Sequence, residues 1–250
     1  MSSLLSLSLV CILVFLVAAL YSSVGHGGAS GYLAVLSLFG IATAEMSSTA
    51  LILNLLVAGV GAYSYWKAKH LSIKLAWPFL ILSVPAAYIG GLLKVSDKTY
   101  FFLLAGALVV AAYRLATART SPEKSDGPRT VPVSAAVPLG GAIGLLSGGV
   151  GIGGGIFLSP LMIFFNWADP KKTAAVSALF IWVNSLAGLG GRLTRDAIVL
   201  GNLAPLLVAA FIGGLMGSYY GANRFSGLML RRILAVVLIV AVFKLIIAAL

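Results

Sequence analysis

The stretch LLSGGVGIGGGIFLSPLMIFF (145–165) is glycine at nearly every position from 148 to 155, with apolar residues on both sides. Glycine has the most backbone freedom to lose, so such a cluster interrupts a helix rather than continuing it. A similar stretch, YSSVGHGGASGYLAVLSLFG (21–40), follows twenty residues that carry no charge. The chain therefore places two flexible, polar breaks inside very hydrophobic sequence.

The amino-acid composition indicates that these breaks lie in a membrane protein. Of the 250 residues, 60% are hydrophobic and 9% are charged, whereas soluble domains carry about a quarter charged residues. Apolar runs of about 20 residues, each long enough to cross a bilayer, recur along the chain. The first run has no basic start and no cleavage site, so it is expected to be an uncleaved helix. We predict an all-α polytopic membrane protein.

The two breaks belong to an internal repeat. Residues 24–28 align with residues 150–154. The alignment continues after each break, where SSTALILN (47–54) aligns with SALFIWVN (177–184). Further on, AYIGGLL (87–93) meets AFIGGLM (210–216). The repeat predicts a first membrane unit over 1–118, a hydrophilic cytoplasmic linker over 119–131, and a second membrane unit over 132–250.

The distribution of basic residues predicts how the halves are oriented. If the short apolar segments after the breaks cross the membrane, 12 of the 17 Lys and Arg residues fall on one side; if they turn back, the division is nearly even. Basic residues concentrate on the cytoplasmic side, so the crossing arrangement is favoured. It gives two inverted repeats of about five segments each, in the cytoplasmic (inner) membrane, with both termini extracytoplasmic.

Inverted repeats with broken helices at matching positions are typical of secondary transporters. The backbone N–H groups freed at each break carry partial positive charge, which predicts a site for a small anion. The candidate substrate-binding residues are those of the breaks and of the helices that follow them. They are Gly25, His26, Gly27, Gly28, Ser47, Asn54, Gly151, Gly153, Gly154, Gly155, Ser177 and Asn184.

Structural roles compete with binding roles for several of these residues. His26 has no counterpart in the second half and suits either anion contact with proton coupling or a structural hydrogen bond. Asn54 and Asn184 suit an anion-donor pair or bonds between helices, and the serines suit N-caps. Leucine at Gly27 or Gly153 is expected to block transport and spare the fold.

Other residues are expected to serve packing or the membrane interface. Glycines at four-residue spacing, at 140, 144 and 148 and again at 213, 217 and 221, predict close helix packing. Aromatic residues near the span ends predict interfacial anchors. They are Tyr63, Tyr65, Trp66, Trp77, Tyr100 and Trp167.

GLLSGGVGIGGGIFLSPLMIFF (144–165) followed by AAVSALFIWVNSLAGLGGR (174–192) resembles the sulfite exporter TauE/SafE family of membrane permeases. The resemblance extends from about residue 5 to 248. It implies transport of a sulfur oxyanion or organosulfonate of the sulfite, thiosulfate or sulfoacetate class.

Several other functions find no support in the sequence. Motifs of hydrolases, metalloproteases and nucleotide-binding loops are absent, so we predict no enzyme activity, no cofactor and no metal. The net charge of +11 lies in short connections rather than on a nucleic-acid-binding face. Cys11 is the single cysteine. An anion channel and a non-transporting membrane subunit remain alternatives, and a coupling proton or other ion and a homodimer stay open.

Overall fold

The computed structural model describes residues 2–39, 43–93, 129–195 and 203–230, together with 232, 233, 235 and 236. All regular structure in these ranges is helical, as predicted. Most of the predicted linker and Tyr100 lie outside the described residues. The helices are α1 (Ser2–Ser22), α2 (Ala29–Leu38), α3 (Thr43–Lys67), α4 (Ile73–Leu92), α6 (Val133–Val150), α7 (Gly155–Phe164), α8 (Pro170–Arg195) and α9 (Ala204–Asn223).

Long apolar helices confirm the prediction of a multi-pass membrane protein. Within the described ranges, five helices are long and apolar enough to cross a bilayer. They are Thr49–Lys67, Ile73–Leu92, Val133–Val150, Pro170–Arg195 and Ala204–Asn223. The ten-residue helices α2 and α7 are each about 15 Å long, which is half of a hydrocarbon core.

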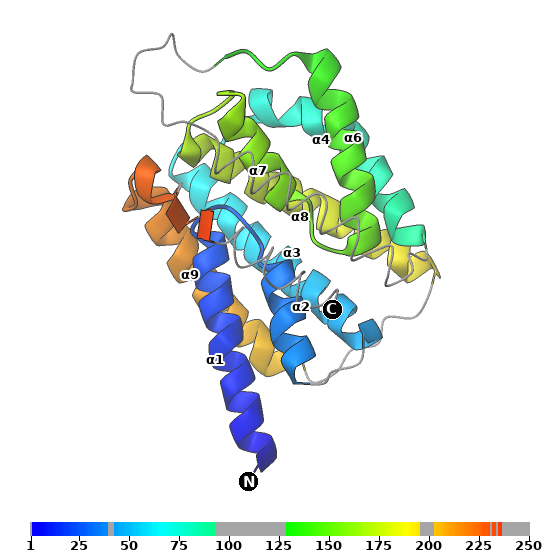
Figure 1. The fold of residues 1–250 in the computed structure, drawn as a ribbon, viewed down its shortest axis with the longest axis vertical. Coiled ribbons are helices and arrows are strands. Elements are labelled where there is room, and N and C mark those ends of the chain that lie inside the picture. Colours follow the sequence, from blue (N-terminus) through cyan, green and yellow to red (C-terminus); the bar gives the residue numbers. More distant parts are fainter. Residues whose placement is uncertain are drawn as a thin grey trace.

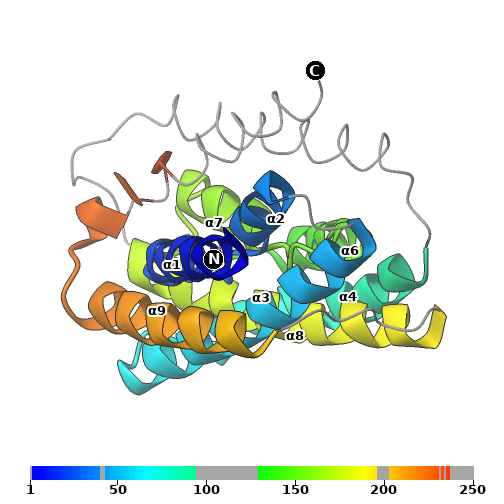
Figure 2. The same cartoon turned by 90° about the horizontal axis from the view of Figure 1, so that it is seen from below.

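The helices pack in a pattern that both halves of the chain share. The central pair, α3 and α8, contact each other, with α1 along α9 on one flank and α4 along α6 on the other (Figures 1 and 2). In addition, α4 contacts α8 and α3 contacts α9. Each of α1 and α6, the helices that precede the breaks, therefore packs along a helix from the opposite half.

Glycines on one face of each flanking pair permit this close approach, as predicted. A Cβ atom at any of these positions would meet backbone of the neighbouring helix, at a carbonyl group in each case. Gly140, Gly144 and Gly148 face Phe79, Ser83 and Ala87 of α4. Gly213 and Gly217 face Phe15 and Ala19 of α1, and Gly221 faces Ser23 just beyond the end of α1.

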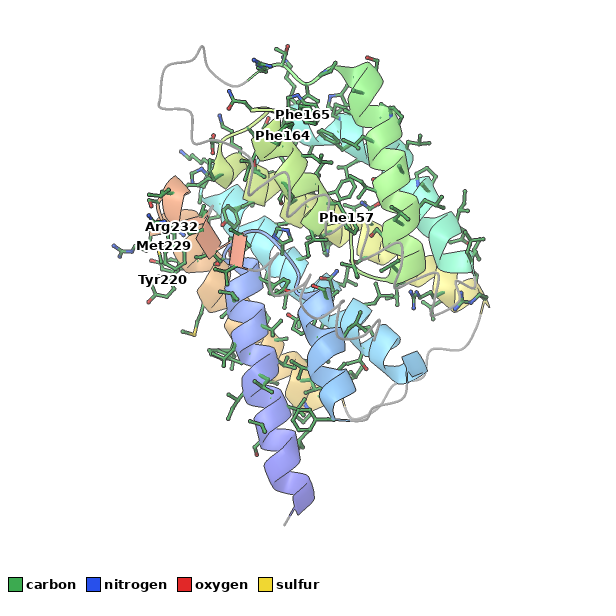
Figure 3. All side chains as sticks on the ribbon, viewed as in Figure 1. Phe157, Phe164, Phe165, Tyr220, Met229 and Arg232 are labelled. Carbon is green, nitrogen blue, oxygen red and sulfur yellow. The ribbon has the colours of Figure 1, made fainter. Side chains whose placement is uncertain are left out.

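Polar contacts define two ends of the molecule. At one end, His70 Nε2 lies 3.0 Å from the Ala222 carbonyl oxygen and Lys171 Nζ donates to the same atom at 3.2 Å. The C-terminal ends of α3 and α9 thus meet the start of α8. At the other end, Arg195 at the close of α8 donates to the Leu93 carbonyl oxygen at 2.7 Å, just beyond α4. The first end also carries outward-pointing Tyr220, Met229 and Arg232 (Figure 3).

The predicted aromatic anchors divide into exposed and buried residues. Tyr63, Trp66 and Trp77 are exposed, as residues facing lipid headgroups should be. Tyr65 and Trp167 are buried, so the prediction is wrong for them. The Tyr65 hydroxyl donates to the carbonyl oxygen of Ser23 at 2.6 Å and so fixes the end of α1.

Candidate functional site

The predicted glycine breaks are confirmed as interruptions with left-handed backbone. The first break, residues 23–28, separates α1 from α2, with φ of +75° at Gly25 and +93° at Gly28. The second break, residues 151–154, separates α6 from α7, with φ of +81° at Gly151, +79° at Gly153 and +80° at Gly154. A side chain in this region costs roughly 1–2 kcal/mol, so glycine is required at these turns.

Both breaks pack against the central helices α3 and α8. A Cβ atom at Gly27 would meet the Asn54 side chain, and one at Gly25 would meet the carbonyl group of Ala174. At Gly153 it would lie 2.6 Å from Asn54 Nδ2 and 2.9 Å from Ser185 Oγ. The expectation that leucine at Gly27 or Gly153 spares the fold is therefore wrong, because protein atoms already fill that space.

Asn54 connects the two breaks through its side-chain amide. Its Oδ1 accepts from the N–H of Ala29, the first residue of α2, at 3.2 Å. Its Nδ2 donates to Ser185 Oγ at 2.8 Å and lies 3.5 Å from the Ile152 carbonyl oxygen. One buried amide thus joins the start of α2, the second break and α8.

Asn184, which aligns with Asn54 in the repeat, lies in a different environment. It is fully buried on α8, yet neither amide atom has a hydrogen-bond partner within the described ranges. Asn184 is one turn from Phe180 and Ile181, whose side chains are the neighbours that a Cβ atom at Gly154 or Gly155 would meet. Asn184 therefore lies one turn along α8 from residues that contact the second break.

Of the two candidate serines, the structure describes the side-chain contacts of Ser177 only. Ser177 is buried, and its hydroxyl lies 2.7 Å from the hydroxyl of Ser159 on α7. The bond joins α7 to α8 next to the second break. Ser47 lies within α3, and its side chain is outside the described part of the structure.

His26 lies in the first break, and its ring is near two backbone groups, those of Val24 and of Gly155 at the start of α7. Nδ1 lies 3.1 Å from the Val24 carbonyl oxygen, and the Tyr21 ring meets the imidazole edge-on at a centroid distance of 6.5 Å. Nε2 is buried without a hydrogen-bond partner among the described residues. Nε2 can therefore still bond to water or to a ligand.

Other buried polar atoms without described partners gather around the breaks. The Tyr32 hydroxyl and Ser147 Oγ belong to this group, together with His26 Nε2 and the Asn184 amide. A Cβ atom at Gly28 would lie 2.8 Å from the Tyr32 ring, and one at Gly154 would lie 3.3 Å from Ser147 Cβ. Buried polar groups in folded proteins normally have partners, so this group points to bound water or a polar ligand.

Two residues that the sequence reasoning did not select also line the breaks. Ser185 accepts the hydrogen bond from Asn54. Arg192 lies in the last turn of α8, and its Nη2 donates to the Gly149 carbonyl oxygen at 3.0 Å. The sequence spacing could have indicated Arg192. It lies eight residues after the candidate Asn184, and residues eight apart on a helix share a face.

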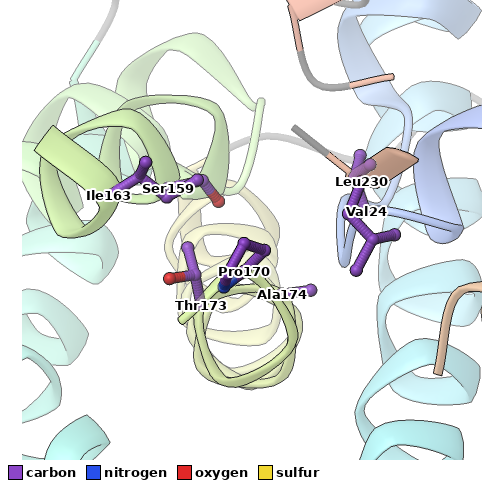
Figure 4. A pocket seen from close by; sticks show the side chains of 7 residues that line it. All are labelled: Val24, Ser159, Ile163, Pro170, Thr173, Ala174 and Leu230. Carbon is purple, nitrogen blue, oxygen red and sulfur yellow. The ribbon is translucent and has the colours of Figure 1, made fainter. Parts of the chain in front are cut away.

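A shallow pocket lies between the first break and the start of α8 (Figure 4). It is open to the surface and has room for about one water molecule. Its two hydroxyl groups, from Ser159 and Thr173, already bond to Ser177 and to the Ala168 carbonyl oxygen. The pocket offers an anion few donors, so the breaks remain the better candidate site. The remaining lining residues are Val24, Ile163, Pro170, Ala174 and Leu230.

The arrangement suits non-covalent binding. The helices α2 and α7 begin at the breaks, and neither the N-cap Gly154 nor the first break supplies a charged capping side chain. In the described part of the chain, no group of His, Cys, Asp and Glu residues could hold a metal ion. These features define a multi-pass helical membrane protein with two broken helices that meet at a central helix pair, a construction used by transporters.

Comparison with known proteins identifies the family. The family model described as Sulfite exporter TauE/SafE matches residues 10–245. The "Probable membrane transporter protein y4hK" of Sinorhizobium fredii (strain NBRC 101917 / NGR234) is 37% identical over 233 residues, covering 92% of this chain and 94% of that protein. The "Probable membrane transporter protein YdhB" of Bacillus subtilis (strain 168) is 27% identical over 229 residues, covering 88% and 91%. No solved structure gives a significant match.

The chain belongs to the sulfite exporter TauE/SafE family of membrane transporters. The resemblance noted from the sequence is thereby confirmed. The protein is therefore a membrane transporter and not an enzyme.

Proposed function

We propose that this protein is a secondary transporter that moves a small anion, of the sulfur oxyanion or organosulfonate class, by alternating access. The observation that carries the proposal is the meeting of two glycine breaks at the α3–α8 pair, near buried polar atoms that have no hydrogen-bond partner among the described residues. The N–H groups at the starts of α2 and α7 provide partial positive charge for the anion. The family description, Sulfite exporter TauE/SafE, supports the substrate class.

The transport mechanism in this proposal depends on two inverted repeats, residues 1–118 and 132–250, joined by a cytoplasmic linker. The directions of the helices that correspond in the proposed repeat support an inversion. The C-terminal end of α3 meets the N-terminal end of α8, and α4 and α9 finish at opposite ends of the molecule. Rocking of one repeat against the other would then expose the same site to each side of the membrane in turn.

A binding screen tests the proposed substrate class. Purified protein is screened by thermal shift and by scintillation proximity against sulfite, thiosulfate, sulfate, sulfoacetate and taurine. We expect saturable binding of at least one sulfur oxyanion or organosulfonate, competed by others of the class. Folded protein that is stabilised by none of the five compounds would contradict the proposal.

The orientation is expected to place the α3–α9 end in the cytoplasm, because Lys67, Lys69, Lys171, Lys172 and Arg224 gather there. Lys172→Cys and Leu93→Cys, each in a Cys11→Ser background, mark the two ends. An impermeant maleimide added to intact cells should label Leu93→Cys and not Lys172→Cys, while lysed cells label both. The reverse pattern would invert the topology and place the termini in the cytoplasm.

Proton coupling is proposed to pass through His26, whose Nε2 has no described partner. An anion beside the ring favours the protonated imidazole, so binding takes up a proton and affinity should weaken as pH rises. Because the ring is buried, which disfavours its charged form, calorimetric titrations extend from about pH 4 to 8. They should show a flatter dependence in His26→Gln. The matched control is His70→Gln at the far end of α3, which should behave as wild type. Identical profiles for His26→Gln and wild type would make His26 structural.

A further inference from the structure

The side chain of Tyr32 lies over the first break. Tyr32 belongs to the first turn of α2. A Cβ atom at Gly28 would lie 2.8 Å from the Tyr32 Cζ atom and 2.9 Å from its hydroxyl oxygen. Because Gly28 has no side chain, the phenol can approach the backbone this closely. The hydroxyl group therefore lies against the turn that leads into α2.

The hydroxyl group of Tyr32 has no partner in the described part of the fold. The residue is fully buried, and its hydroxyl oxygen makes no hydrogen bond to any described residue. Tyr21 is close enough to interact with Tyr32 electrostatically, but the Tyr21 hydroxyl accepts its hydrogen bond from Ser30 Oγ, at 3.2 Å. A buried hydroxyl without a partner is unfavourable, because it has lost its bonds to water.

Packing explains the ring of Tyr32 but not its hydroxyl group. The ring belongs to a buried apolar cluster that includes Val14, Ala18 and Leu53. Phenylalanine would fill the same space without burying an unpaired polar group. The hydroxyl group therefore points to a partner that is not part of the chain.

The proposed repeat offers a comparison for this position. When the alignment of residues 24–28 with residues 150–154 is continued, Tyr32 aligns with Leu158. Leu158 is also fully buried. An apolar side chain thus satisfies the packing at the corresponding position of α7, and the hydroxyl group is particular to the first break.

The start of α2 has room for an additional donor. The N–H group of Ala29, the first residue of the helix, already donates to Asn54 Oδ1 at 3.2 Å. This N–H group is therefore engaged by the protein. The Tyr32 hydroxyl carries a proton that it can donate from beside the same turn.

We propose that Tyr32 is a substrate-binding residue whose hydroxyl group donates a hydrogen bond to an oxygen atom of the bound sulfur oxyanion or organosulfonate. The inference rests on the proposed function, because it adds a donor to the same anion site. A hydrogen bond to a charged group is stronger than one between neutral groups. The hydroxyl group thus contributes to anion affinity and not to the stability of the anion-free protein.

Removal of this single hydroxyl group tests the proposal. Sulfite, thiosulfate, sulfate, sulfoacetate and taurine are titrated by scintillation proximity against wild type, Tyr32→Phe and Tyr63→Phe. Tyr63 is an exposed residue of α3, so Tyr63→Phe is the matched control. We expect Tyr32→Phe to weaken the binding of each compound that wild type binds by about tenfold or more. Tyr63→Phe should bind as wild type does.

Thermal melting without anion separates a binding role from a structural one. Tyr65→Phe provides the structural comparison, because it loses the 2.6 Å hydrogen bond to the Ser23 carbonyl oxygen and should melt at a lower temperature. Tyr32→Phe should melt as wild type does or at a higher temperature. A decrease as large as that of Tyr65→Phe would show that the Tyr32 hydroxyl has a structural partner, and it would overturn the inference.

The outcomes also separate this inference from the proposed function. Folded Tyr32→Phe with wild-type affinity for a compound that wild type binds overturns the inference and leaves the proposed function intact. Wild type that binds none of the five compounds overturns the proposed function, and the inference falls with it.

A second measurement keeps the test decisive if Tyr32→Phe does not fold. Fluorotyrosine at position 32 retains the ring and the hydroxyl group, and its fluorine NMR signal reports their surroundings. Saturation with the tightest-binding compound of the five should shift this signal, whereas the signal of fluorotyrosine at position 63 should not move. An unchanged signal at position 32 in saturated protein overturns the inference.

Discussion

Gly153→Ala is expected to abolish anion transport and to lower the stability of the protein by at least about 2 kcal/mol. Two effects combine at this position. The φ of +79° is unfavourable for any L-residue with a side chain. The added methyl group would also lie 2.6 Å from Asn54 Nδ2 and 2.9 Å from Ser185 Oγ, inside the hydrogen-bonded connection between the breaks.

The matched control is Gly190→Ala on α8. A Cβ atom there would meet only the Tyr88 ring at 3.8 Å, an ordinary van der Waals contact, so this variant should retain transport and stability. Stability is measured as thermal melting, with size-exclusion chromatography used to quantify the protein that remains folded. Transport is measured as uptake into proteoliposomes. Wild-type melting and uptake in Gly153→Ala would show that the second break tolerates a side chain and is not a constrained site.

The two aligned asparagines are expected to respond in opposite ways to replacement by leucine. Asn54→Leu leaves the Ala29 N–H and Ser185 without their partner, and each buried unpaired group costs about 1–3 kcal/mol. Asn184→Leu removes an amide that has no described partner. Stability should therefore fall strongly in Asn54→Leu, and should be unchanged or higher in Asn184→Leu.

Binding completes the contrast between the asparagines. If the Asn184 amide serves the anion, Asn184→Leu should weaken binding about tenfold or more while the protein stays folded, since a hydrogen bond to a charged group contributes about 1.5–3 kcal/mol. Thermal melting and scintillation proximity binding on the same preparations give both quantities. Asn184→Leu with wild-type affinity would remove Asn184 from the site. A loss of stability as large as that of Asn54→Leu would mean that the amide has a structural partner.

The breaks could be predicted from the sequence because their cause is local. Positive φ at Gly25, Gly28, Gly151, Gly153 and Gly154 requires glycine whatever surrounds it, and clusters of glycine in apolar sequence mark such backbone directly. The glycine stripes on α6 and α9 were predictable for a similar reason, since four-residue spacing places them on one helix face.

The partners of the polar side chains could not be predicted in the same way. Asn54 bonds to residues 98 and 131 positions away, and a single sequence carries no direct signal for such contacts. The repeat made Asn54 and Asn184 look equivalent, yet one amide is bonded and the other has no described partner.

Hydrogen–deuterium exchange with and without a saturating anion tests most directly the claim that the anion binds at both breaks. The tightest-binding anion of the screen is used with purified wild-type protein, and exchange is followed by mass spectrometry. Bound anion should slow exchange in peptides covering 23–32 and 151–158 together, because the N–H groups there become donors to it. Peptides from the middle of α4 and α9 should not change. Saturated protein with unchanged exchange in both breaks, and slower exchange elsewhere, would contradict the account.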